Sequence, residues 1–143
     1  MVEKISEYTF EQIEIGHSKK LDLIITESMV NDFAKLSGDL SSLHMDETYA
    51  KSTQFKKRVV HGMLLASFFS RVVGMYLPGK HALYSSQNLE FRNPCFIGDK
   101  ISISSQVIDK SEATKTIKIE SKITNEDDKI LLYGVGRIII RND

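Results

Sequence analysis

Hydrophobic residues recur along the first third of the chain with a strand period and then with a helix period. Residues 21–25 place alternate apolar side chains on one face, which predicts a first strand. Apolar positions then follow helical spacing over residues 30–37. Thr26 is suited to cap the start of this helix, and Gly38 is suited to end it in a left-handed conformation. A polar loop, residues 39–44, is predicted next.

A second helical segment differs from the first because it is apolar on every side. A short helix is expected from about Glu47, with Asp46 as its cap. Residues 62–76 then form an apolar run that Pro78-Gly79 terminates. A helix without a polar face has to be buried on nearly all of its surface. Residues 63–76 are therefore predicted to form a central helix.

The apolar period changes to two in the second half of the chain, which predicts strands. In residues 83–92 the side chains of the two strand faces alternate along the chain. Each of the next two strands, which contain Ile101 and Ile117, has one apolar face. Residues 130–140 are apolar on both faces, as expected of an interior strand. Short turn-like segments separate these strands, at 93–94, 98–99, 110–112 and 125–128. Short connections favour an antiparallel meander.

One buried helix and a mostly antiparallel sheet predict an α+β hot-dog fold, in which the sheet wraps around a long central helix. One sheet cannot cover such a helix completely, so we expect a second copy of the chain to complete its burial as a homodimer. The 143 residues fit a single domain, 1–143.

Composition narrows the function classes. Lysines plus arginines and aspartates plus glutamates number 19 each, so charge gives no case for nucleic-acid binding. The one cysteine, Cys95, excludes an intrachain disulfide and a cysteine-based metal cluster, and it suits a reducing cytoplasm. The first residues lack the apolar core of a signal peptide. The apolar stretch 59–77 contains charged residues and glycines and is a poor membrane span.

Candidate chemistry lies in the loop after the first helix, where Asp39 and His44 stand five positions apart. An Asp and a His can exchange protons near neutral pH, particularly if burial raises the pKa of the Asp. Addition of water to an activated alkene needs such a pair. Taken alone, the two residues fit a turn Asp and a solvated His better than a catalytic pair.

Gly62, at the predicted start of the buried helix, is a second candidate. Its amide belongs to a helix N-terminus, where unpaired N–H groups favour negative charge. A thioester carbonyl placed there would be polarised as enolate character develops. A close backbone contact explains a glycine here equally well. His61 is interpreted as a capping or hydrogen-bonded support residue. Basic residues 56–58 precede this segment and either contact substrate phosphates or remain solvated.

The residues around Asp39 and Gly62 resemble motifs of the MaoC-like hydratase family. Residues 33–46, with Ser37-Gly38-Asp39 and Leu43-His44, resemble the family's hydratase signature, and residues 60–67 resemble its helix start. Residues 93–99 are similar to its strand-turn-strand element. The resemblance runs from about Leu21 to Ile140 and is greatest for small, stand-alone (R)-specific enoyl-CoA hydratases.

The resemblance implies a hot-dog homodimer that hydrates trans-2-enoyl-CoA to (R)-3-hydroxyacyl-CoA. Asp39 and His44 match the family's catalytic pair, and Gly62 matches its carbonyl-polarising amide. Ser70 falls where a helix serine lines the family's site. No metal and no organic cofactor is implied. The implied partner is an acyl thioester of coenzyme A or of acyl carrier protein.

Ser41-Ser42 departs from the family pattern, which has Asn-Pro at this place. The substitution removes a side chain that braces the loop and a ring that stiffens it. Three alternatives stay open: a 3-hydroxyacyl-[acyl carrier protein] dehydratase, a hot-dog acyl-thioesterase and a non-catalytic acyl-binding subunit. The thioesterase is disfavoured because residues 62–76 contain no Asp or Glu.

Overall fold

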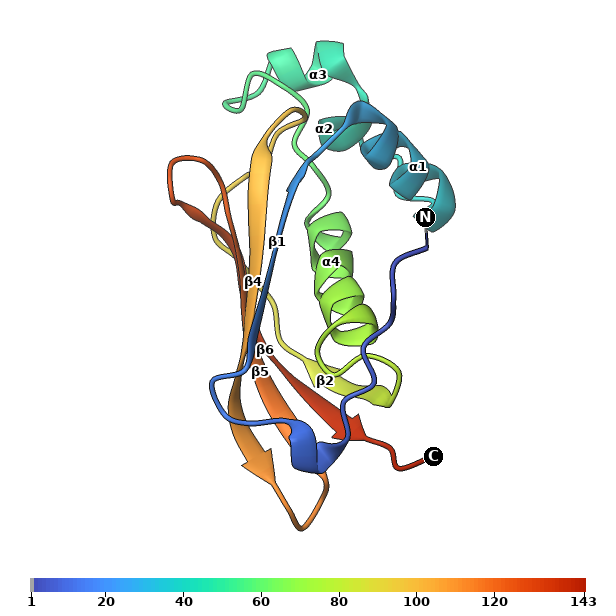
Figure 1. Cartoon of the computed structure of the whole chain (residues 1–143). Coiled ribbons are helices and arrows are strands. Elements are labelled where there is room, and N and C mark those ends of the chain that lie inside the picture. Colours follow the sequence, from blue (N-terminus) through green and yellow to red (C-terminus); the bar gives the residue numbers. More distant parts are fainter. Residues whose placement is uncertain (1) are drawn as a thin grey trace.

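The strands pair into one curved, antiparallel sheet whose inner face holds the long helix, as Figure 1 shows for the computed structural model. The structure describes residues 2–143. The strand order is β1-β4-β5-β6-β2, and β3 pairs with β6. The strands are β1 (Ser18–Ile24), β2 (Ala82–Gln87), β3 (Glu90–Phe91), β4 (Lys100–Ser111), β5 (Thr116–Thr124) and β6 (Ile130–Ile140).

The helices lie at one end of the sheet and along its inner face. They are α1 (Glu27–Ser37), α2 (Ser42–Met45), α3 (Glu47–Lys51) and α4 (Gly62–Met75), with a 3-10 turn at Phe10–Gln12. Among the described residues, none of these helices has the length and apolar character needed to span a bilayer. Figure 1 shows α4 against the sheet and α1, α2 and α3 grouped beyond its N-terminal end.

The apolar faces predicted from the sequence form the core. Ile103, Val107 and Ile123 are completely buried on the sheet face that packs against α4. From α4, the buried residues are Leu64, Leu65, Phe69, Val72 and Val73. A cross-strand hydrogen bond of 2.7 Å joins the hydroxyls of Ser105 and Ser121 within this face, so that both buried polar groups are satisfied.

Residues 83–92 do not form the single strand expected from their alternation. A β-bulge between Tyr84 and Ser86 shifts the register against β6, and the chain leaves the sheet between β2 and β3. A bulge adds one residue, so the apolar period no longer follows one face. Leu83, before the bulge, is 51% exposed, and Phe91, after it, is 54% exposed.

The long helix is less enclosed in the single chain than its composition predicts. Met63 is 57% exposed, and Ser67, Ser70 and Gly74 are exposed on the same face of α4. These positions are separated by three or four residues, so they share one side of the helix. One sheet therefore covers one side of α4 and leaves the other open.

Candidate active site

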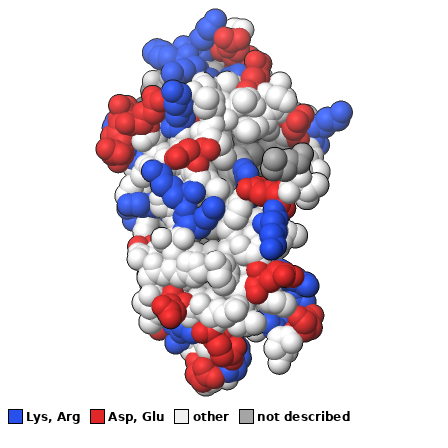
Figure 2. All heavy atoms as spheres, in the orientation of Figure 1, with Lys and Arg blue, Asp and Glu red and all other residues white. Residues whose placement is uncertain are grey.

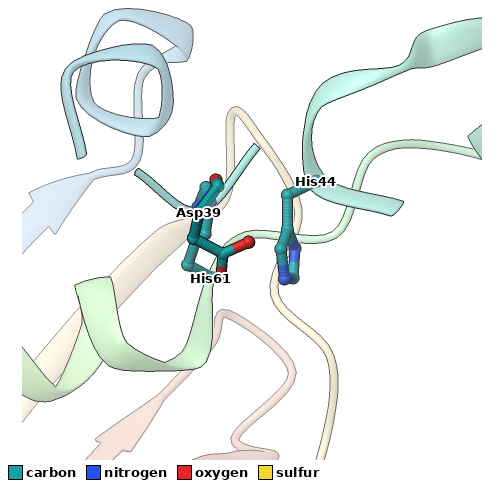
Figure 3. A group of neighbouring side chains, drawn as sticks. All are labelled: Asp39, His44 and His61. Atoms are coloured by element: carbon teal, nitrogen blue, oxygen red, sulfur yellow. The ribbon is translucent and has the colours of Figure 1, made fainter. Parts of the chain in front are cut away.

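Three polar side chains from separate parts of the chain meet at the N-terminal end of α4 (Figure 3). Asp39 follows Gly38, whose φ of 80° ends α1 in the left-handed conformation predicted for it. His44 lies on α2, a four-residue helix within the segment predicted to be a loop. His61 is the N-cap residue of α4.

The carboxylate of Asp39 is exposed at the mouth of the site, not buried. Its Oδ1 accepts a hydrogen bond of 3.2 Å from the backbone N–H of Ser41. This hydrogen bond stabilises the charged form and lowers the pKa of Asp39 from its ordinary value. The condition that burial raises this pKa is therefore not met, and Asp39 is a carboxylate at neutral pH.

His44 is held by its ring and presents the opposite ring nitrogen to the site. Its Nδ1 lies 2.6 Å from the carbonyl oxygen of Val59. A carbonyl oxygen only accepts hydrogen bonds, so Nδ1 carries the proton and donates it. In the neutral ring, Nε2 is then an unprotonated acceptor. Both members of the predicted pair thus enter the site as proton acceptors.

His61 connects the start of α4 to the Asp39 loop. The ring is only 1% exposed, and its Nε2 donates to the carbonyl oxygen of Asp39 over 3.0 Å. It stacks on His44 with ring centroids 4.1 Å apart, and it also contacts Phe33. This geometry agrees with the supporting role expected from the sequence.

One coordinating atom from each of Asp39, His44 and His61 lies within 4.8 Å of the other two, so one water molecule can contact more than one of them. A carboxylate and two imidazoles suit a divalent cation, but His61 Nε2 is engaged with the Asp39 carbonyl and His61 Nδ1 is buried, so His61 offers no free ligand atom in this arrangement. Figure 3 shows the Asp39 carboxylate directed to the His44 ring, with His61 behind it.

A cavity of about 470 Å³ opens beside Asp39 and His44. It extends along the start of α4, where Gly62, Met63 and Leu65 line it. The other lining residues are Phe55, Val59, Val60, His61, Phe91, Arg92, Asn93, Pro94, Cys95 and Leu131. This predominantly apolar wall suits an acyl chain.

Two further residues that line the cavity limit its chemistry. Burial raises the pKa of the Cys95 thiol to about 12, so it is not a thiolate nucleophile at neutral pH. Phe91 from β3 lies over Gly62: a Cβ at Gly62 would come within 2.5 Å of the Phe91 ring. A residue larger than glycine at position 62 would therefore require the Phe91 ring to move.

Ser70 is not brought to this cavity. It lies on the exposed face of α4, eight residues beyond Gly62, and it is not among the lining residues. In the single chain, therefore, Asp39, His44 and Gly62 meet and Ser70 lies apart from them.

Residues 56–58 line a second, more polar cavity of about 270 Å³. Lys51, Lys56, Lys57 and Arg58 line it together with Glu27, Glu47 and Ile97. Lys and Arg side chains gather beside α3 in Figure 2. Lys56 and Lys57 are exposed, and the Lys57 ammonium lies 4.6 Å from the centre of the Phe96 ring.

Comparison with known proteins places this chain in a family. The MaoC like domain profile matches residues 11–128. An (R)-specific enoyl-CoA hydratase of Aeromonas caviae is 40% identical over 113 residues, which are 76% of this chain and 84% of that protein. A mitochondrial 3-hydroxyacyl-[acyl-carrier-protein] dehydratase of Arabidopsis thaliana is 31% identical over 91% of this chain and 79% of its own length.

The fold is likewise shared with solved structures. The unliganded R-hydratase from Pseudomonas aeruginosa superposes with a TM-score of 0.91 and 28% sequence identity. The match covers 97% of this chain and 89% of that one. The α+β hot-dog prediction is therefore confirmed.

Proposed function

This chain belongs to the family of MaoC-like domains, and from that membership we propose that it adds water to a trans-2-enoyl thioester, or removes it from the (R)-3-hydroxyacyl product. The observation that carries the proposal is the presence of two proton acceptors, Asp39 and His44, beside an apolar cavity. Enoyl-CoA hydration requires this combination of proton transfer and acyl binding.

The catalytic roles of Asp39 and His44 follow from their protonation. A water molecule between the Asp39 carboxylate and His44 Nε2 loses a proton to one of them as its oxygen attacks C3. The same proton then passes to C2, so the protein ends in its starting state. The other group hydrogen-bonds to the water and orients it. No metal or organic cofactor takes part in this proposed sequence.

We assign the thioester carbonyl to the Gly62 amide. Attack at C3 moves negative charge onto this carbonyl oxygen, and an N–H already aimed at that position stabilises the charge. Gly62 is the first residue of a 14-residue helix, whose first N–H groups have no partner within the helix. The helix dipole adds to the same effect.

The carrier of the acyl group is either coenzyme A or acyl carrier protein. Similarity to a coenzyme A hydratase favours the first, and similarity to a carrier-protein dehydratase keeps the second as an alternative. The exposed Lys56 and Lys57 offer positive charge to a phosphate in either case. The single, buried Cys95 suits a reducing compartment, and we propose the cytoplasm.

We further propose that the active form is a homodimer. The open face of α4 has Met63 at its N-terminal end, and β2, which forms one edge of the sheet, runs near α4 in Figure 1. A second copy can cover both, because two-fold assemblies bury the same surface of each chain. Whether Ser70 then contacts substrate depends on this assembly, and its predicted role stays a prediction.

The proposed function is tested with crotonyl-CoA. We expect the absorbance of the enoyl thioester to fall without release of free thiol, and the product to be (R)-3-hydroxybutyryl-CoA. Thiol release would instead indicate a thioesterase, and no reaction with either crotonyl-CoA or its carrier-protein thioester would indicate a binding subunit. Comparing kcat/KM for the two thioesters identifies the carrier. Asp39→Asn is the matched inactive control.

A further inference from the structure

We propose that Arg58 is a positioning residue for catalysis, which holds His44 in place through its backbone; this inference rests on the proposed function. The Nε of Arg58 donates a hydrogen bond of 2.6 Å to the carbonyl oxygen of His44. Arg58 does not line the cavity beside Asp39 and His44. Its effect on the reaction would therefore pass chiefly through the position of His44.

The guanidinium of Arg58 joins α2 to α1. Nη1 donates to Glu27 over 3.1 Å, and Nη2 donates to Asn31 over 2.8 Å, four residues further along the same helix. Nη2 also lies 3.5 Å from the sulfur of Met45. The planar fork of an arginine makes several such bonds at fixed angles, which a lysine cannot reproduce.

Burial separates Arg58 from the two lysines before it. Its side chain is only 12% exposed, whereas that of its ion-pair partner Glu27 is 66% exposed. A largely buried guanidinium is costly unless its donors are paired, and these donors are. Of the basic residues 56–58, Arg58 is thus engaged within the protein, and the two lysines remain available to a phosphate.

Arg58 and Val59 together fix His44 at two points. The ring of His44 donates to the carbonyl oxygen of Val59, and the backbone carbonyl of His44 accepts from Arg58. The Val59 N–H also donates to the carbonyl of Leu43. At the other end of α2, the side chain of Ser41 makes no capping hydrogen bond. The Arg58 contact therefore restrains the end of α2 that carries the catalytic ring.

Loss of the Arg58 contact is expected to displace His44 without weakening the binding of the acyl group. A displacement of a catalytic group by about 1 Å can cost about a hundredfold in rate. We expect Arg58→Met, which keeps the apolar stem of the side chain without its donors, to lower kcat on crotonyl-CoA by about ten- to a hundredfold. KM should stay within about threefold of the wild-type value, because acyl-chain contacts are unchanged.

A spectroscopic measurement separates positioning from a general effect on folding. In ¹⁵N-histidine NMR spectra of the wild type, His44 should show the tautomer protonated at Nδ1. Arg58→Met should give a mixture of the two tautomers, because the hydrogen bond from His44 Nδ1 to the Val59 carbonyl is no longer held in place. Arg58→Lys retains the charge but has a single donor nitrogen, so its kcat and its His44 spectrum should lie between those of the wild type and of Arg58→Met. Arg141→Ala removes a cation near the C-terminus, bonded to Asp143 and to the Lys80 carbonyl, and should change neither.

The inference is overturned if folded Arg58→Met keeps wild-type kcat, or if its kcat falls while the His44 spectrum is unchanged. If Arg58→Met does not fold, the test passes to Arg58→Lys. The inference is then overturned if Arg58→Lys has the same kcat and the same His44 spectrum as the wild type. These results are distinct from failure of the proposed function. In that case the wild-type protein itself would not hydrate crotonyl-CoA, while the tautomer measurement would still report on the Arg58 contact.

Discussion

At the scale of single residues, the proposed catalytic groups are held in place chiefly by main-chain atoms. The carboxylate of Asp39 accepts from the amide of Ser41, and the ring of His44 donates to the carbonyl of Val59. His61 in turn donates to the carbonyl of Asp39. Such bonds set protonation and orientation together, which is what acid–base catalysis requires.

Replacing either acceptor should abolish most of the activity and leave the fold intact. We expect Asp39→Asn and His44→Ala each to lower the hydration rate by about two or more powers of ten. Neither residue belongs to the apolar core, so the circular dichroism spectrum should not change. Asp127→Asn, in the turn between β5 and β6, serves as the control. Near-normal turnover in a folded Asp39 or His44 variant would refute the assignment.

Gly62→Ala should lower activity although its amide N–H is retained. The new methyl group would meet the Phe91 ring at 2.5 Å, and this exposed ring would turn toward the acyl site. The free energy of unfolding should fall only slightly, because an exposed side chain can move. Steady-state kinetics of Gly62→Ala with and without Phe91→Ala test the cause. If removing the ring fails to recover activity, crowding by Phe91 is not the reason.

The lowered pKa of Asp39 gives a pH-dependent contribution to stability. A carboxyl group whose pKa is lower in the folded state stabilises the protein above its unfolded pKa, and this contribution is lost as pH falls through the folded pKa. We expect the difference in unfolding free energy between wild type and Asp39→Ala to shrink as pH falls below the ordinary value of 3.8. Urea unfolding over a pH series measures it, and a constant difference would contradict the hydrogen bond from Ser41.

At the scale of elements, local signals in the sequence located most helix ends. Thr26 caps α1 by accepting from the amide of Met29, and Asp46 caps α3 by accepting from the amide of Tyr49, as their residue types predicted. By contrast, α2 has four residues, too few to show a helical period. The bulge at Ser85 was also hidden, because nothing in an alternating pattern marks an inserted residue.

The start of α2 should accept the family's Asn-Pro pair. Ser41 has φ −60° and ψ 146°, the extended conformation that a residue before proline adopts, and Ser42 is the first residue of the helix, where proline fits. We expect Ser41→Asn with Ser42→Pro to hold or raise turnover and to stabilise the protein by about 0.4–1 kcal/mol.

Kinetics on short and long enoyl-CoA substrates, together with thermal unfolding, check this double variant. Should the serines instead bind an unusual acyl group, turnover on that substrate would fall while crotonyl-CoA would be little affected. A fall on all substrates, in a protein of normal stability, would reject the explanation from loop stiffness.

At the scale of the whole molecule, the sequence predicted the wrapped helix but not the contacts that assemble the site. The apolar run 62–76 and the alternation within β4 and β5 were sufficient for the architecture. His61 lies 22 residues from Asp39, and Arg58 lies 31 residues from Glu27. No local pattern links residues so far apart, so their contacts appear only once the chain is folded.

The open face of α4 predicts association. Met63, at 57% exposure, and Leu83 on the edge strand β2, at 51%, are large apolar side chains left in water by the single chain. We expect sedimentation at micromolar concentration to show a homodimer, and Leu83→Glu to shift it toward monomer. Ile15→Glu, at an exposed apolar position before β1, is the control. A wild-type monomer at this concentration would be incompatible with the prediction.

The main-chain fixing of Asp39 and His44 also has an evolutionary consequence. Every residue type has a backbone carbonyl, so a substitution at position 59 that leaves the backbone undistorted still supplies the acceptor for His44. The peptide N–H at position 41, which donates to Asp39, is lost only on substitution by proline. Substitutions among the apolar residues that line the cavity can then accumulate without disturbing the proposed proton-transfer groups. Lineages descending from such an ancestor are free to diverge in chain-length preference while inheriting one unaltered chemistry.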